Sequence, residues 1–142
     1  RFLDELSTVC KKENISLLPY SPIGGGVLSG KYNNAFYPED ARFSAYMKHE
    51  NPRVQAQATR FVNDKTIAAT IKYLELAREY GISPVTLAVA YSKHFDFVAS
   101  TIIGARTSEQ LDESLKAFNF AIDNELLSKI ELIQKEILYP MG

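Results

Sequence analysis

Apolar and polar positions along the 142-residue chain predict helices separated by two short apolar runs. Apolar side chains recur at helical spacing over residues 2–13, and Asn14 tolerates the left-handed conformation that ends a helix. Residues 15–21 are mainly apolar, as in a strand covered on both faces, so we predict a strand with Pro19 near its end. Residues 97–103 predict a second strand of the same kind.

Helical patterns fill most of the remaining chain. Residues 53–94 predict helices, with Gly81 as a stop and Ser83-Pro84 as the cap and first residue of the next helix. Residues 107–138 predict the C-terminal helices, capped by Thr107 with Gln110 as its capping-box partner and, further on, by Asp123. The inward stripe of the first of these helices is predicted to be Leu111, Leu115 and Phe118.

The order of these elements is typical of an α/β fold. Two strands joined by helical crossovers are expected to pair in parallel. Residues 31–52, between the first strand and the helices, are irregular but rich in aromatic side chains, which favours an ordered lid. Two strands alone would leave bare backbone edges, so we expect this chain to be part of a larger parallel structure or to need a partner.

Composition narrows the function classes. Hydrophobic residues make up 46% of the chain and the net charge is −1, which argues against disorder and against nucleic-acid binding driven by bulk charge. No apolar run approaches the ~20 residues that span a membrane. The single cysteine, Cys10, excludes an internal disulfide, and His49 and His94 lack metal-ligand spacing. We therefore predict no metal site.

Candidate chemistry lies where the two predicted strands end, since parallel α/β folds bind ligands at the carboxyl ends of their strands. The first end leads through residues 22–26 (PIGGG) to Lys31, and glycine amides with a lysine suit a phosphate. The second leads through residues 104–106 (GAR) to a helix N-terminus, where Arg106 suits another anion. The alternatives are a loop that only turns the chain and a plain capped helix. Together the two ends predict a dinucleotide lying across both.

Two segments at these ends resemble a known family. Residues 18–32 (LPYSPIGGGVLSGKY) resemble the seventh-strand segment and following loop of aldo-keto reductases, and residues 100–113 (STIIGARTSEQLDE) resemble their eighth-strand cofactor segment. The resemblance covers essentially the whole chain and is greatest for the bacterial and plant branch that includes potassium-channel β-subunits. It implies an α/β fold, the C-terminal portion of a (β/α)8 TIM barrel, with strands 7 and 8 at residues 15–21 and 97–103.

The resemblance also implies a cofactor, NADP(H), bound in an extended form. Tyr20 would stack on the nicotinamide, the lid arginine Arg42 would help to close over the cofactor, and Gly104 and Arg106 would hold the 2′-phosphate. Ser114 departs from the asparagine that is common in the family, because serine is shorter and lacks the amide that would contact adenine. The remaining contacts implied are the pyrophosphate with Ser21, Pro22, Ile23, Gly25 and Lys31, and the adenosine end with Gln110 and Glu113.

The family's catalytic Asp, Tyr, Lys and His come from the first half of the barrel and match no position here, so no catalytic residue is predicted. We expect the NADP(H)-binding half of a cytoplasmic reductase that passes hydride to a small aldehyde or ketone, inactive by itself. One alternative is a non-catalytic cofactor-binding module that associates with itself or with a missing N-terminal half. Another is a small phosphate-binding domain unrelated to reductases.

Overall fold

The computed structural model describes residues 2–33 and 37–141, so Arg1 and residues 34–36 of the predicted lid lie outside it. Helices dominate the described residues. The elements are η1 (Phe2–Leu6), α1 (Ser7–Glu13), η2 (Gly24–Ser29), α2 (Arg42–Met47), α3 (Pro52–Phe61), α4 (Asp64–Glu79), α5 (Pro84–Lys93), α6 (Ser108–Leu115), η4 (Lys116–Asn119) and α7 (Asn124–Glu136). Among them, η1 is a π-helical turn, and η2 and η4 are 3-10 helices.

Helix boundaries follow the capping signals of the sequence. Asn14 ends α1 with φ 53° and Gly81 follows α4 with φ 63°, both left-handed as predicted. Ser83 accepts a hydrogen bond from the backbone three residues on, with Pro84 first in α5, and Asp123 caps α7 in the same way. These boundaries are local properties, because a cap needs only the side chain and the turn beside it.

The two predicted strands are present only as isolated contacts in the described residues. Residues 15–21 and 97–103 run side by side and parallel, as predicted, but form no regular strand. The ladder cannot extend because Pro19 has no N–H and each run is paired along one edge only. The bridges are Leu17 with Val98 and Tyr20 with Ile102, and the hydrogen bonds are Leu17 N to Phe97 O (2.8 Å), Ala99 N to Leu17 O (3.0 Å) and Ile102 N to Pro19 O (2.8 Å).

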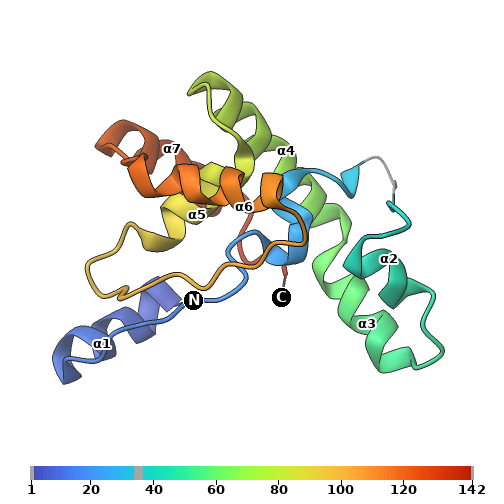
Figure 1. Ribbon diagram of the computed structural model, residues 1–142. Helices are drawn as coiled ribbons and strands as arrows, with labels where there is room; N and C mark the ends of the chain where they lie inside the picture. The colour runs from blue at the N-terminus through green and yellow to red at the C-terminus, as the bar shows by residue number, and fades with distance from the viewer. Residues whose placement is uncertain (1, 34–36, 142) are drawn as a thin grey trace.

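Two apolar clusters hold the described residues together. The helix core joins α4, α5 and α7 through buried side chains such as Leu76, Leu87 and Leu126. The second cluster, called here the lid core, consists of Val27, Tyr32, Ala41, Phe43, Ala58 and Val62. The predicted lid is thus ordered where described, and it contains the short helix α2, which was not predicted. Figure 1 shows α2 and α3 together on one side of the molecule, away from α1.

Several apolar side chains predicted to be inward are exposed. On the α6 side, Leu111, Leu115 and Phe118 are 41%, 51% and 80% exposed, so the prediction of an inward stripe is wrong for the described chain. The physical reason is that no described element packs on that face.

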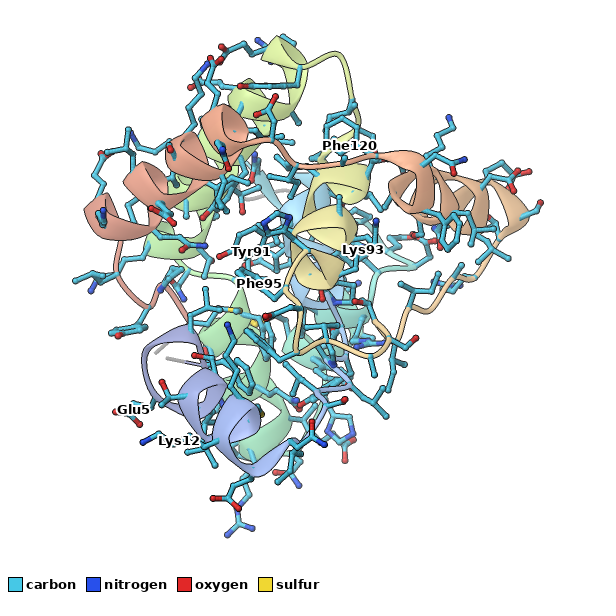
Figure 2. The ribbon with its side chains drawn as sticks, turned by 90° about the vertical axis from the view of Figure 1, so that its left-hand side faces the viewer. Glu5, Lys12, Tyr91, Lys93, Phe95 and Phe120 are labelled. Atoms are coloured by element: carbon cyan, nitrogen blue, oxygen red, sulfur yellow. The ribbon has the colours of Figure 1, made fainter. Side chains whose placement is uncertain are left out.

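Figure 2 shows η1 and α1, the first two helical elements, at the periphery of the molecule, with Glu5 and Lys12 on their surface. Within residues 2–33 and 37–141, no helix combines the length and apolar character needed to cross a membrane.

Candidate functional site

The glycine loop, residues 21–26, is shaped by an unusual backbone at Ser21. Ser21 has φ 56°, a left-handed conformation that non-glycine residues seldom adopt and that is often found at functional sites. Its carbonyl accepts a hydrogen bond from Gly24 N (2.9 Å), and its hydroxyl Oγ accepts one from Gly25 N (3.1 Å). Ser21 therefore organises the loop directly after the bridge at Tyr20.

In this conformation the glycines leave space beside the loop but offer a ligand no free N–H groups, because their amides donate within the loop. The amides of Gly24 and Gly25 are used by Ser21, and Gly26 N donates to Ile23 O (3.0 Å). All three glycines have positive φ, which lets the chain turn tightly. Sequence reasoning assigned these amides to phosphate, but here they hold the loop, so an anion's charge would have to be met by side chains.

Two lid side chains occupy the space beside the glycines. A Cβ built on Gly25 would lie 2.7 Å from the ring of Phe43, and one on Gly26 would lie 2.8 Å from Nζ of Lys31. Real Cβ atoms do not approach other atoms this closely. The ammonium group of Lys31 therefore lies directly against the glycine loop. The Phe43 ring leaves no room for a side chain at Gly25, whereas at Gly26 the flexible end of Lys31 would have to move and φ 98° disfavours a side chain.

Three predicted cofactor residues share one electrostatic neighbourhood. A guanidinium nitrogen of Arg106 lies 3.6 Å from Oδ2 of Asp40 and also donates to the Asp40 carbonyl, which ties the lid to residues 104–106. Partial burial, and then the nearby charges of Arg106 and Arg42, lower the pKa of Lys31, while Asp40 opposes them. Lys31 therefore lies against the loop, and the charges of Asp40, Arg106 and Arg42 are near enough to act on it.

The N-terminus of α6 is capped by its own side chains. Thr107 accepts from Gln110 N (3.4 Å), as predicted, but the Gln110 side chain accepts from Arg106 N (3.0 Å) rather than completing a capping box with Thr107. Hydrogen bonds from its own N–H, Thr107 and Ser108 lower the pKa of the exposed Glu109 carboxyl. Because these donors are in use, the Arg106 side chain is the main group offered to an anion here.

A cleft of about 720 Å³ lies between the α4–α5 turn and α6. Gln110 and Glu113 line one wall, and Ser83 and Thr86 line the other. Thr86 Oγ1 donates to the carbonyl of Glu113 (3.0 Å), which joins α5 to α6 at the base of the cleft. Gln110 and Glu113, predicted to contact adenosine, therefore line one cavity.

The remaining predicted residues differ in their surroundings. The side chain of Tyr20 is 80% exposed, so its ring is accessible. Pro22 is partly buried, and Ile23 packs partly against the helix core. Gly104 is exposed, its φ is not left-handed, and a Cβ built on it would have no neighbour within 4 Å. Nothing within the described chain requires glycine at position 104.

Sequence reasoning missed two side chains of this site. Asp40 pairs with Arg106 across 66 residues, and Phe43 packs on Gly25 while stacking on Phe61, with ring centroids 5.1 Å apart. The nearest sequence signal was their position beside the lid arginine Arg42, but neither contact has a local pattern. Among the described residues, no three His, Cys, Asp or Glu side chains gather as metal ligands would.

Comparison with known proteins identifies relatives of this chain. A family model described as the aldo/keto reductase family matches residues 2–135. Protein tas of Escherichia coli K12 is 32% identical over 135 residues, which is 95% of this chain. A probable voltage-gated potassium channel β subunit of Arabidopsis thaliana is 32% identical over 121 residues, or 84% of this chain.

The structural likeness extends over nearly the whole chain. The structure of a glycerol dehydrogenase from Gluconobacter oxydans aligns with a TM-score of 0.69 and 22% identity, covering 97% of this chain and 39% of that one, which is a likeness of fold. The chain spans only about a third of its relatives, 36% of protein tas and 35% of the Arabidopsis protein. With the family model matched over residues 2–135, the chain belongs to the aldo/keto reductase family and represents part of such a protein.

Proposed function

We propose that this chain forms the NADP(H)-binding part of an aldo-keto reductase. The observation that carries the proposal is the position of Lys31 against the glycine loop, with the Arg106–Asp40 ion pair and Arg42 near enough to act on the Lys31 charge. Residues 15–21 and 97–103 would be the seventh and eighth strands of a (β/α)8 barrel, which would place the loop and Arg106 at the carboxyl ends of neighbouring strands.

The chemistry of these side chains fits a phosphorylated dinucleotide. Tyr20 offers an exposed aromatic ring against which a flat nicotinamide can stack. Lys31 and Arg42 would neutralise the pyrophosphate, with Ser21, Pro22, Ile23 and Gly25 lining its path. A guanidinium can bind a phosphate through two parallel hydrogen bonds, which suits Arg106, beside Gly104, to the 2′-phosphate.

The cleft beside α6 suits the adenosine end. Gln110 offers an amide and Glu113 a carboxylate, the groups that recognise base and ribose edges. When bound, NADPH supplies the hydride that reduces a small aldehyde or ketone. The residues of this chain would bind and orient that cofactor, whereas the family's Asp, Tyr, Lys and His have no counterpart in this sequence.

Titration of the purified chain with NADPH and NADH tests this function. We expect saturable binding of NADPH, weaker binding of NADH because it lacks the 2′-phosphate, and no reduction of aldehydes or ketones. Equal affinity for the two cofactors would contradict the assignment of Arg106. Cofactor-dependent carbonyl reduction by the chain alone would contradict its proposed inactivity.

Exposed apolar side chains favour a second candidate, a non-catalytic module that associates with itself or with an N-terminal half. Leu18, Tyr20 and Ile102 are exposed in the paired runs, as is Phe118 beside α6. Apolar surface of this kind favours association. Light scattering after size exclusion should show species larger than 15.9 kDa. A clean monomer with cooperative unfolding would argue against a required partner.

Replacing Gly104 with alanine is expected to weaken NADPH binding without affecting the fold. A methyl group there has no neighbour within 4 Å, so the free energy of unfolding should change by no more than ~0.5 kcal/mol. The methyl would instead obstruct a cofactor that approaches the backbone closely. Chemical denaturation and fluorescence titration measure the two effects. Unchanged NADPH affinity would show that the cofactor does not approach position 104.

Raising the pH is expected to weaken NADPH binding through loss of the Lys31 charge. Partial desolvation and neighbouring cations lower the pKa of Lys31 from its ordinary 10.5, so the free protein loses this proton at a lower pH than a lysine of ordinary pKa would. A bound phosphate raises that pKa again. Binding should therefore take up protons, and affinity should fall as the pH rises through the free-state pKa of Lys31.

Calorimetry at about pH 9, in two buffers of different ionisation enthalpy, measures this proton uptake. The variant Lys31→Arg keeps its positive charge at this pH, so it should bind NADPH without taking up a proton. Identical uptake by the two proteins would place the titrating group elsewhere.

A further inference from the structure

We propose that the C-terminal strap, residues 138–141, positions the glycine loop for the cofactor, and that Arg60 is a positioning residue acting through it. The inference rests on the proposed function for its effect on NADP(H), whereas the effect on the loop can be measured without any ligand. The strap lies between the end of α3, with its junction to α4, and the loop, and both regions are far from the strap in the sequence.

Two side chains tether the strap. Arg60, at the end of α3, donates from Nε to the carbonyl of Met141 (3.0 Å). Asn63, the cap of α4, donates from Nδ2 to the carbonyl of Pro140 (3.2 Å). Tyr139 has φ 46°, a left-handed turn that marks the change of direction after α7. The strap is therefore held at consecutive carbonyls by residues about 80 positions earlier.

The sulfur of Met141 lies near the glycine loop. A Cβ added at Gly24, which the native residue lacks, would lie 4.0 Å from this sulfur, so the Met141 side chain borders the space beside Gly24. In Figure 1 the red ribbon after α7 runs close to the blue ribbon that contains the loop. A methionine adapts its shape to irregular surfaces, which suits it to support a loop without side chains of its own.

The same helix, α3, supports the loop from a second direction. Phe61 stacks on Phe43, and Phe43 lies against Gly25. Phe61 is next to Arg60 in α3. Phe61 supports Gly25 through its stacking on Phe43, and Arg60 supports Gly24 through the strap. Glycines have more conformations available than other residues, so a loop of three needs such external contacts to keep one shape.

Hydrogen exchange of the loop amides, measured without cofactor, tests the strap directly. The test proteins are a chain ending at Leu138, Arg60→Ala and Met141→Gly. We expect the amides of Gly24 to Gly26 to exchange about tenfold faster, comparable to losing one hydrogen bond, and those of α5 to stay unchanged. Arg53→Ala is the matched control, an exposed arginine on the same helix, and Met141→Leu should preserve the contact.

NADPH titration of the same proteins supplies the second readout. Affinity should fall about tenfold in the three test variants and in neither control, because the binding conformation of the loop is less populated. Unchanged hydrogen exchange of the loop amides in all three variants would contradict the proposed role of the strap. Equally faster exchange of the α5 amides would also contradict it, because it would indicate a loss of general stability. Loop loosening in a protein that binds no NADPH would leave the strap supported and overturn the proposed function instead.

Discussion

Replacing Arg106 with alanine is expected to weaken NADPH binding by roughly 10- to 150-fold and to leave NADH binding nearly unchanged. Charge-assisted hydrogen bonds contribute about 1.5–3 kcal/mol, and only NADPH carries the 2′-phosphate that would receive them. The free energy of unfolding should change little, because the Arg106 side chain is 69% exposed and its pairing with Asp40 is a surface ion pair. Parallel fluorescence titrations with the two cofactors measure the NADPH and NADH affinities of the wild type and the variant.

Asp40 adds a second test of the same site. Its carboxylate already occupies the Arg106 guanidinium, so a phosphate must displace or share it. Asp40→Asn should therefore tighten NADPH binding, and by less when Arg106 is absent. Arg106→Lys should fall between wild type and Arg106→Ala, since lysine keeps the charge but loses the two-pronged geometry. An unchanged NADPH affinity in Arg106→Ala would contradict the assignment of the 2′-phosphate to Arg106.

Replacing Gly25 with alanine is expected to lower the free energy of unfolding by about 2–5 kcal/mol. Two effects add. The backbone at Gly25 has φ 65°, which an L-residue adopts at a cost of about 1–2 kcal/mol, and the new methyl group would overlap the Phe43 ring. Phe43 is buried in the lid core and cannot move without disturbing its aromatic neighbours. Urea denaturation followed by circular dichroism measures the loss.

Variants at Gly81 and Phe43 separate the backbone cost from the steric overlap. Gly81 has nearly the same backbone, φ 63°, but a Cβ there would have no neighbour within 4 Å, so Gly81→Ala reports the backbone cost alone. Phe43→Ala should itself cost about 3–5 kcal/mol. In that background Gly25→Ala should cost no more than Gly81→Ala does. A Gly25→Ala loss that is independent of Phe43 would contradict the close packing described here.

The parts of the fold that sequence predicted are those governed by local interactions. The caps at Asn14, Ser83 and Asp123 each depend on one side chain and the adjoining turn, and all were recognised. The fate of Leu111 and Phe118 was not, because helical periodicity identifies an apolar face without saying whether anything covers it. The same holds for the paired runs, since an apolar segment forms a regular strand only with neighbours along its edges.

In the candidate site, too, the local features could be predicted and the long-range contacts could not. The motif around Gly25 and Lys31 was recognisable, and the structure does bring Lys31 against the loop. That the loop amides are used internally was not visible, because it depends on the left-handed backbone of Ser21. The Asp40–Arg106 contact joins residues 66 positions apart, a separation over which neither spacing nor composition carries information.

The lid core also has a consequence for the order in which the chain folds. All its buried members lie between Val27 and Val62, so its contacts join residues that are near one another in the sequence. Closing such short loops costs little chain entropy, and structures of low contact order form quickly. The packing around Gly25 should therefore be established early, whereas the contacts of Arg106 and Met141 must wait for distant segments. We therefore expect the lid core to act as a folding nucleus onto which the rest of the candidate site is later assembled.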